Sequence, residues 1–238
     1  MYNIPHISRR VCTKRSISIS IARNFAAKMK PSPYKAQLIS QSSLDHGKWI
    51  QLRKITYKDP LGKEREWEMA VRTTRTDTTG LDAVSILALI KKPELTPLVV
   101  LTKQFRPPCN KVVIELPAGL IDPKESVEST AERELLEETG YVGSVVSLSH
   151  TVMPLFSDPG LTNANMALVT MDVDGTDPRN VDPQPQLEDG EFIEVFTLPL
   201  SGLLGNLADV CAREGAVVDL RLYHLAEGLL LGEKMFLK

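Results

Sequence analysis

Three glutamates lie close together in the middle of the chain. Glu134, Glu137 and Glu138 stand at positions i, i+3 and i+4, a spacing that places all three side chains on one side of a helix. Carboxylates crowded in this way repel one another and lose hydration where they are covered, unless a cation joins them. Mg²⁺ suits a site that has few carboxylates and receives further oxygens from phosphate. The spacing therefore favours a divalent-metal site.

The helix that must carry these glutamates is expected over residues 126–139. Its apolar side chains recur at every fourth position, at Val127, Ala131 and Leu135. At about 100° per residue, Glu138 falls inside this apolar stripe, while Glu134 and Glu137 flank it. A purely solvated glutamate-rich face, which is the alternative, would lie opposite the stripe. The overlap favours partly buried carboxylates that share a cation.

Residues near both ends of this helix indicate where it starts and stops. Ser126 is one candidate for the N-terminal cap, and Asp122, with Glu125 three residues later, is the other. Gly140 suits the position just past the C-terminus. Arg133 precedes the glutamate pair and is expected to brace Glu125 or one metal-ligating carboxylate.

The other elements are mostly short strands. Runs rich in β-branched and aromatic residues predict strands at 48–57, 66–74, 83–90, 98–105, 112–116, 145–152, 165–173 and 191–198. A turn at 117–119 offers backbone carbonyls to the same ion. We expect a loop over the acidic, proline-rich 174–190, and helices with a structural role over 201–213 and 217–231. The class is α+β, with a mixed sheet between helices.

Charge is divided unevenly along the chain. Its 238 residues include 28 basic and 30 acidic side chains, for a net charge of −2. Residues 1–44 contain no Asp or Glu but eight basic side chains, at Arg9, Arg10, Lys14, Arg15, Arg23, Lys28, Lys30 and Lys35. Subtracting these leaves 20 basic against 30 acidic residues in 45–238, a net charge of −10. An acidic body of this kind disfavours a nucleic-acid partner.

The acid-free leader, residues 1–44, has the composition of a mitochondrial transit peptide. The stretch Arg23-Asn24-Phe25-Ala26 resembles a cleavage site for a matrix protease. We therefore expect a protein of the mitochondrial matrix. Two alternatives remain open: a disordered basic arm, and a start at Met29 that leaves the protein in the cytoplasm or nucleus.

The scattered cysteines and histidines disfavour several kinds of site. Cys12, Cys109 and Cys211 have neither CxxC nor ligand-like spacing, which disfavours a zinc site or a disulfide framework. The four histidines form no constellation for nucleophilic catalysis. No apolar run approaches the about 18–20 residues that span a bilayer, so no membrane partner is expected.

The residues around the glutamates follow a fixed pattern of types. It runs Gly119, five residues, Glu125, seven residues, Arg133-Glu134-Leu135, one residue, Glu137-Glu138, one residue, Gly140-Tyr141. The pattern resembles the Nudix box, with Tyr141 where an aliphatic residue is more usual. Further segments resemble the ADP-ribose (ADP-sugar) pyrophosphatase subgroup of Nudix hydrolases, at 47–49, 67–68, 72–75, 104–108, 115–122, 158–163 and 189–192.

This resemblance implies a fold and an activity. The implied fold is a Nudix α/β/α sandwich with a mixed sheet over 81–238, preceded over 45–80 by a small antiparallel β-domain that contributes to a homodimer and to adenine binding. The implied reaction is Mg²⁺-dependent hydrolysis of the pyrophosphate bond of ADP-ribose and related ADP-sugars to AMP and ribose 5-phosphate. Whether Mn²⁺ substitutes for Mg²⁺ stays open.

The resemblance also assigns roles to individual residues. The implied metal ligands are Glu134, Glu137, Glu138 and the carbonyl oxygen of Ala118. The residues expected to carry catalysis are Glu191, Glu137 and Arg133. Glu191 matches a loop glutamate that acts as general base or positions the water, and Glu188 and Glu194 are nearby alternatives for that role.

Substrate contacts are implied at Trp49, Trp67, Glu68, Arg72, Arg106 and Asp158. The two tryptophans match a pair that sandwiches adenine, one from each subunit; the alternative is that they are packing anchors. Arg72 and Arg106 carry forked donors that suit phosphate oxygens, and the alternative for Arg106 is a plain surface cation.

Two other functions stay open beside ADP-ribose hydrolysis. One is a broader Nudix hydrolase of nucleoside-diphosphate sugars or oxidised nucleotides, which would differ in its pocket contacts and not in its metal site. The other is a Nudix module that senses ADP-ribose without turnover. Such a module would be expected to lose box carboxylates, and all of them are present here.

Overall fold

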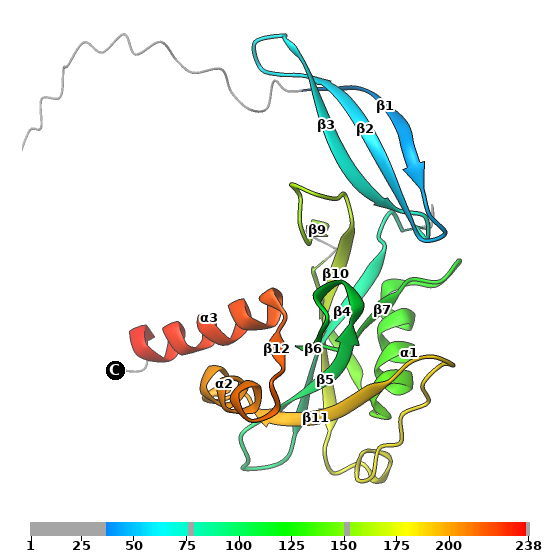
Figure 1. The fold of residues 1–238 in the computed structure, drawn as a ribbon. Helices are drawn as coiled ribbons and strands as arrows, with labels where there is room; N and C mark the ends of the chain where they lie inside the picture. Colours follow the sequence, from blue (N-terminus) through cyan, green and yellow to red (C-terminus); the bar gives the residue numbers. More distant parts are fainter. Residues whose placement is uncertain (1–36, 76–78, 150–152, 237–238) are drawn as a thin grey trace, which may run out of the picture.

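Two β-sheets organise the chain (Figure 1). The computed structural model describes residues 37–75, 79–149 and 153–236. The smaller sheet is antiparallel and has the order β1–β2–β3, with strands β1 (Gln37–His46), β2 (Ile50–Lys58) and β3 (Glu64–Arg72). It stands beside the body of the molecule as a separate curved layer (Figure 1).

Strand β1 overlaps the expected leader. Residues 37–44 were assigned to the leader of 1–44 by composition, yet they pair antiparallel with β2 along its length. This segment is polar and serine-rich, so local propensity does not mark it as a strand, and its pairing with β2 decides its conformation. Residues 1–36, including the stretch Arg23–Ala26, lie outside the described residues.

The body is built on a mixed sheet between helices, as the sequence predicts. Its main path runs β12–β6–β5–β4–β10–β8, and β11, β7 and β9 pair with β5, β4 and β10. The strands are β4 (Ala83–Lys91), β5 (Leu98–Arg106), β6 (Lys111–Glu115), β7 (Ala118–Leu120), β8 (Ser144–Leu148), β9 (Leu155–Phe156), β10 (Asn165–Asp174), β11 (Ile193–Pro199) and β12 (Val217–Val218). Strand β10 is parallel to β4, and β12 is parallel to β6.

Helices cover both faces of this sheet. Helix α1 (Val127–Thr139) lies on one face, while α2 (Leu203–Glu214) and α3 (Leu220–Phe236) lie on the other (Figure 1). The short 3₁₀ turns η2 (Pro107–Cys109) and η4 (Pro178–Asn180) interrupt two of the connections between described elements. Each face has its own apolar cluster, one under α1 and one under α2 and α3. The α/β/α arrangement is confirmed, and burial on both faces explains the continuous apolar run of β4.

Several expected element boundaries were wrong. The last helix begins at Leu220 and not at 217, because Val217–Val218 pairs with β6 as β12. Strand β8 is Ser144–Leu148, and residues 150–152 of the expected strand lie outside the described residues. Strand β7 forms at Ala118–Leu120, where a turn was expected, because it pairs with β4. The differences at β12 and β7 come from pairing with a partner distant in sequence, which local propensity does not include.

A buried ion pair joins the two sheets. Arg75, just past β3, donates from Nε to Asp82 Oδ1 at 2.9 Å and from Nη2 to Asp82 Oδ2 at 2.6 Å. Asp82 is 2% exposed and also accepts from the backbone N–H of Asn165 at 2.9 Å. Arg75 Nη2 donates further to the carbonyl of Asn163 at 2.6 Å. The two sheets are therefore joined by this ion pair and its hydrogen bonds as well as by the covalent connection between β3 and β4.

None of the helices in the described ranges combines the length and the apolar character that crossing a bilayer requires.

Candidate active site

The helix that carries the glutamates is capped at both ends. Ser126, one of the two expected caps, accepts from Ser129 N at 3.1 Å, and Ser129 Oγ accepts from Ser126 N at 3.0 Å, which completes a capping box. Asp122 is not the cap; its N–H contacts Glu125 Oε2 at 3.4 Å. Gly140 ends α1 with a φ of 75°. The register of the glutamates on α1 is therefore fixed from both ends.

Glu138 is the most deeply placed carboxylate of the three. It is 7% exposed, within the apolar stripe as the spacing predicts, and its Oε2 accepts from the backbone N–H of Ala118 at 3.0 Å. Burial raises the pKa of Glu138 to about 8, against that hydrogen bond, and the nearby Glu134 and Glu191 raise it further. The protein thus holds a carboxyl that favours a proton, or another cation, at neutral pH.

Glu134 presses against the backbone of β7. A Cβ atom placed on Gly119 would lie 1.9 Å from the carboxyl carbon of Glu134, so any larger residue here would force the Glu134 carboxylate to move. Burial raises the pKa of Glu134, which the neighbouring Arg133 opposes. The glycine of the sequence pattern therefore leaves room for this position of a box glutamate.

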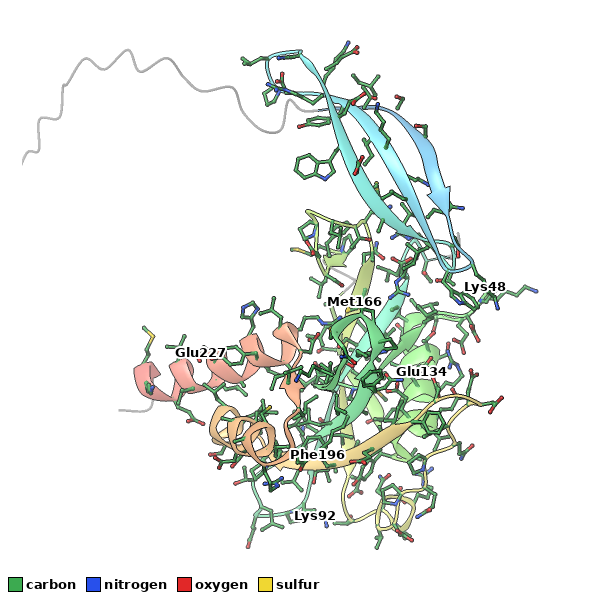
Figure 2. The ribbon with its side chains drawn as sticks, viewed as in Figure 1. Lys48, Lys92, Glu134, Met166, Phe196 and Glu227 are labelled. Atoms are coloured by element: carbon green, nitrogen blue, oxygen red, sulfur yellow. The ribbon has the colours of Figure 1, made fainter. Side chains whose placement is uncertain are left out.

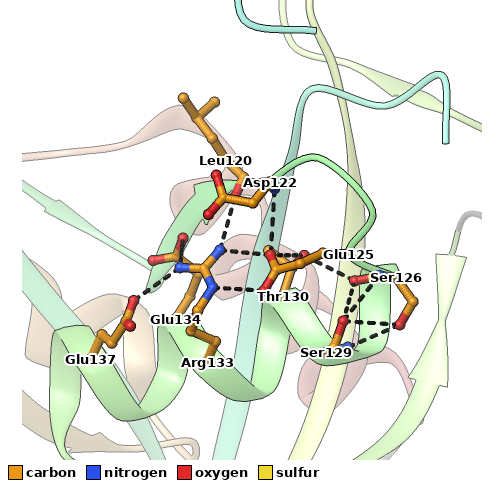
Figure 3. Close-up of polar contacts among 9 residues, drawn as sticks. All are labelled: Leu120, Asp122, Glu125, Ser126, Ser129, Thr130, Arg133, Glu134 and Glu137. Carbon is orange, nitrogen blue, oxygen red and sulfur yellow. Dashed lines mark hydrogen bonds and ion pairs between the residues drawn. The ribbon is translucent and has the colours of Figure 1, made fainter. Parts of the chain in front are cut away.

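Arg133 is the cation that the structure supplies to this cluster (Figure 3). Its Nε and Nη2 donate to the two oxygens of Glu125 at 2.9 and 2.8 Å, and hold the pKa of Glu125 down at about 2. Its Nη1 donates to Glu134 Oε1 at 2.8 Å and to Glu137 Oε2 at 2.9 Å. The sequence predicted either Glu125 or one ligand as its partner; Arg133 holds Glu125 and two glutamates together.

A loop carries two more carboxylates to the same place. Gln186 N donates to the carbonyl of Glu137 at 2.7 Å, which attaches the loop to α1. Beyond it, Glu191 Oε2 accepts from Glu188 N at 3.1 Å. Both glutamates line the cleft that contains the box residues. Glu194, the third candidate base, points elsewhere and lies 3.7 Å from Lys103 Nζ.

One cleft brings together most of the expected site. Figure 2 shows Met166 on the side of the body that faces the small sheet and Glu134 farther from that sheet, on α1. The cleft is lined by Arg72, Ala83, Gln104, Arg106, Glu115, Ala118, Gly119, Leu120, Asp122, Arg133, Glu134, Glu137, Glu138, Met166, Glu188, Glu191 and Arg221. Gln104 and Glu115 lie in segments that resemble the subgroup but were given no role, whereas Met166 and Arg221 lie outside every such segment and no local pattern marks them.

The donor set fits a hard divalent cation. Glu134, Glu137 and Glu138 supply carboxylate oxygens beside Ala118, which matches the preference of Mg²⁺ for oxygen ligands. In the described part of the chain, no three Asp, Glu, His or Cys side chains already converge as a ligand cage. Arg133 holds two of the glutamates and the Ala118 N–H holds the third. A cation at this place would therefore compete with Arg133 for carboxylate oxygens.

The two tryptophans lie at different places on the small sheet. Trp49 is 60% exposed in the β1–β2 connection, where Lys48 Nζ lies 4.3 Å from its ring centre. Trp67 is 52% exposed on β3 and donates from Nε1 to the carbonyl of Gly160 at 3.1 Å. Ile50, next to Trp49, pairs with Arg72, whereas Trp67 pairs with Ile55. Ile50 and Ile55 lie five residues apart on β2, so the two tryptophans are at positions separated by roughly 17 Å along the sheet, at 3.4 Å per residue. Within one chain the two rings do not face each other.

The remaining expected contacts lie outside this cleft. Glu68 lines a separate shallow pocket with Lys54, Glu66 and Trp67. The carbonyl of Asp158 accepts from the N–H groups of Leu161 and Thr162 at 3.0 and 2.9 Å, in an exposed turn. Trp49 lines a second pocket, which shares Arg72, Met166 and Arg221 with the cleft. The cleft and the Trp49 pocket therefore adjoin at these three residues.

Comparisons with known proteins identify relatives of this chain. The family model described as NUDIX domain matches residues 81–218. An ADP-ribose pyrophosphatase of Saccharomyces cerevisiae is 44% identical over 230 residues, which cover 94% of this chain and 97% of that protein. An ADP-sugar pyrophosphatase of Mus musculus is 42% identical over 200 residues, which cover 84% of this chain and 89% of that protein.

A solved structure shares the fold. The crystal structure of an ADP compounds hydrolase superposes with a TM-score of 0.57 at 18% identity, covering 86% of this chain and 98% of the other. At this identity the likeness concerns the arrangement of strands and helices alone.

Proposed function

The chain belongs to the NUDIX family, and from that premise we propose that it hydrolyses the pyrophosphate bond of ADP-ribose and related ADP-sugars. The products are AMP and ribose 5-phosphate. The observation that carries this proposal is a single cleft in which Glu134, Glu137 and Glu138 lie beside Arg72 and Arg106. Carboxylates for a cation and guanidinium groups for phosphate are the two parts that diphosphate hydrolysis needs.

A divalent ion, for which we propose Mg²⁺ with Mn²⁺ as the alternative, would be held by Glu134, Glu137, Glu138 and the carbonyl of Ala118. Such an ion neutralises phosphate charge and lowers the pKa of a bound water. The buried position of Glu138 and the crowding of Glu134 make these carboxylates good cation ligands, since their own repulsion is relieved on binding.

The chain's own residues supply positioning and proton transfer. Arg133 stays bound to both oxygens of Glu125 and orients Glu134 and Glu137 through the hydrogen bonds that its Nη1 donates to them. Arg72 and Arg106 donate to phosphate oxygens. Glu191, on the loop attached to α1, accepts the proton of the attacking water. Glu188 is the alternative base, because it lines the same cleft, whereas Glu194 pairs with Lys103.

We further propose that the active form is a homodimer. Trp49 and Trp67 lie at different levels of the small sheet, so one chain does not present both rings to one adenine. Trp49 lines a pocket that adjoins the cleft, whereas Trp67 and Glu68 line a pocket that shares no residue with the cleft. A second copy is needed to bring Trp67 to the base held at Trp49. Mass measurement in solution tests the dimer, and a monomeric active enzyme would contradict it.

For localisation we propose the mitochondrial matrix, from the acid-free leader. Cleavage within 23–26 would leave β1 intact, since that strand begins at Gln37. Fusion of residues 1–36 to a fluorescent protein tests whether this segment directs a protein to mitochondria. A fusion that stays in the cytoplasm would favour the basic-arm alternative.

Parallel hydrolysis assays test the activity. We expect Mg²⁺-dependent release of AMP from ADP-ribose, with a higher kcat/KM than for ADP-glucose or 8-oxo-dGDP, and loss of activity in EDTA. Equal efficiency on all three substrates would favour the broader hydrolase. Binding of ADP-ribose without turnover would favour the sensing module.

A further inference from the structure

Arg221 lines the active-site cleft although the sequence gives its helix a structural role. It lies in the first turn of α3, beyond residues 81–218 that the family model matches. Together with Arg72 and Met166 it belongs to both the cleft and the adjoining Trp49 pocket. Arg221 therefore lies at the boundary between the two pockets.

Asp219 holds this arginine in a fixed orientation. Its Oδ1 accepts from the backbone N–H and from Nε of Arg221, each at 2.9 Å, and its Oδ2 accepts from Nη2 at 2.9 Å. Asp219 N in turn donates to the carbonyl of Ile114 on β6 at 3.0 Å. The Asp219 hydrogen bond raises the pKa of Arg221, so the guanidinium stays cationic. A fixed side chain loses little entropy when it binds a ligand.

One edge of this guanidinium has a weak partner. Nη1 donates to the thioether sulfur of Met166 at 3.0 Å, and a thioether is a poor acceptor. Nη2 lies 4.0 Å from Glu115 Oε1, beyond hydrogen-bond distance. The side chain of Arg221 is 42% exposed. Nη1 of Arg221 will therefore form a stronger hydrogen bond to an anionic oxygen of a ligand than to the thioether of Met166.

Glu115 sets Arg221 beside Arg106. Glu115 is buried, and its Oε2 accepts from Arg106 Nε at 2.7 Å while its Oε1 faces Arg221. The two guanidinium groups thus share one carboxylate at the edge of the cleft. The Glu115 carboxylate offsets part of the repulsion between the two cations, and two neighbouring guanidinium groups suit a ligand that carries two neighbouring phosphates.

We propose that Arg221 is a substrate-contacting residue, whose Nη1 edge donates to a phosphate oxygen of a nucleoside-diphosphate sugar. The proposal rests on the proposed function, since it names a further contact in the same site. It extends the site to helix α3. The competing explanation is that Arg221 serves only to pair with Asp219 at the start of that helix.

Steady-state kinetics on the full chain test this contact. We expect R221M to lower kcat/KM for ADP-ribose by about 10- to 100-fold, mainly through KM, which corresponds to one lost charge-assisted hydrogen bond. R221K should recover part of the loss, because it keeps the charge without the fork. The matched control is R213M, in the exposed last turn of α2, which should leave kcat/KM unchanged.

Binding of ADP with Mg²⁺, measured by calorimetry, separates this proposal from the proposed function. ADP contains the diphosphate without the terminal ribose, so R221M should weaken its binding by a similar factor. If R221M lowers the melting temperature but keeps wild-type kcat/KM and ADP affinity, Arg221 is structural and the proposal is wrong. If R221M does not fold, R221K decides by the same measurements. If the wild type does not hydrolyse ADP-ribose, the proposed function fails, while the ADP measurement still tests Arg221.

Discussion

Two arginine–carboxylate clusters, one at the joint between the sheets and one on α1, differ in how their charges balance. At the joint, Arg75 meets one carboxylate, Asp82, and backbone groups satisfy the rest of that carboxylate. On α1, Arg133 serves Glu125, Glu134 and Glu137 at once, with Glu138 close by. In the first cluster one cation balances one carboxylate. In the second cluster one cation faces several carboxylates, so negative charge is in excess.

This difference separates a structural cluster from a site. A buried pair that is matched one to one, with its remaining lone pairs occupied, stabilises a fixed geometry and has no vacancy for a ligand. A cluster with excess carboxylates is tolerated when a cationic ligand completes it. Removing one charge should therefore affect a different property in each cluster. At the joint, loss of Arg75 should lower stability, and on α1, loss of a glutamate should lower activity.

The largest expected effect is on catalysis. E137Q should lower kcat for ADP-ribose by about 10³-fold if Glu137 is a ligand of the proposed metal, because the variant removes that negative charge, while stability stays the same or rises as carboxylate repulsion falls. Initial-rate assays at saturating Mg²⁺ and a thermal melt measure both. E132Q, on the exposed side of the same helix, is the matched control and should be silent. Wild-type kcat in E137Q would remove Glu137 from the metal site.

The complementary change at the joint should affect stability. R75M leaves Asp82 buried without its cation, and should lower the free energy of unfolding by about 3 kcal/mol. Below the unfolding transition, kcat/KM should remain within twofold. Urea unfolding measures the loss, and K91M, which breaks the more exposed pair with Asp172, should cost about 0.5 kcal/mol or less. Equal losses of stability in R75M and K91M would show that the buried Arg75–Asp82 pair stabilises the protein no more than an exposed ion pair does.

A third change tests the crowding of Glu134. G119A places a Cβ atom where the Glu134 carboxyl lies, so the carboxylate must move, and a shift of about 1 Å should lower kcat/KM by about 10²-fold. G205A on α2 has open space around the added methyl group and should leave kcat/KM unchanged. An active G119A enzyme would show that the position of Glu134 is not critical.

The smallest effect concerns pH. The folded-state pKa of Glu138, about 8, is above its ordinary value of 4.5, so its contribution to the stability of metal-free protein is present below pH 4.5 and is lost as pH rises through 8. Metal binding needs the charged carboxylate, so Mg²⁺ affinity should rise by up to about tenfold per pH unit below 8. Calorimetry at pH 6.5, 7.5 and 8.5 measures this slope, and a flat profile would contradict it.

Local features of the fold and site were predictable from the sequence. The periodicity of 126–139 predicted α1 and the inward position of Glu138, because both depend on residues a few positions apart. Strand β1, the Arg75–Asp82 pair and the place of Arg221 in the cleft were not predicted. Each of these depends on a partner far along the chain or on pairing that overrides propensity.

The sequence by itself determined which carboxylates share a helix face, since the 3.6-residue turn converts spacing into direction. It did not determine what faces them. The tertiary structure brings Arg72, Arg106, Glu191 and Arg221 to the cleft that α1 lines, and Arg72 comes from the small sheet. Only the tertiary structure could decide this, because strand order and loop attachment place side chains that no local interaction joins.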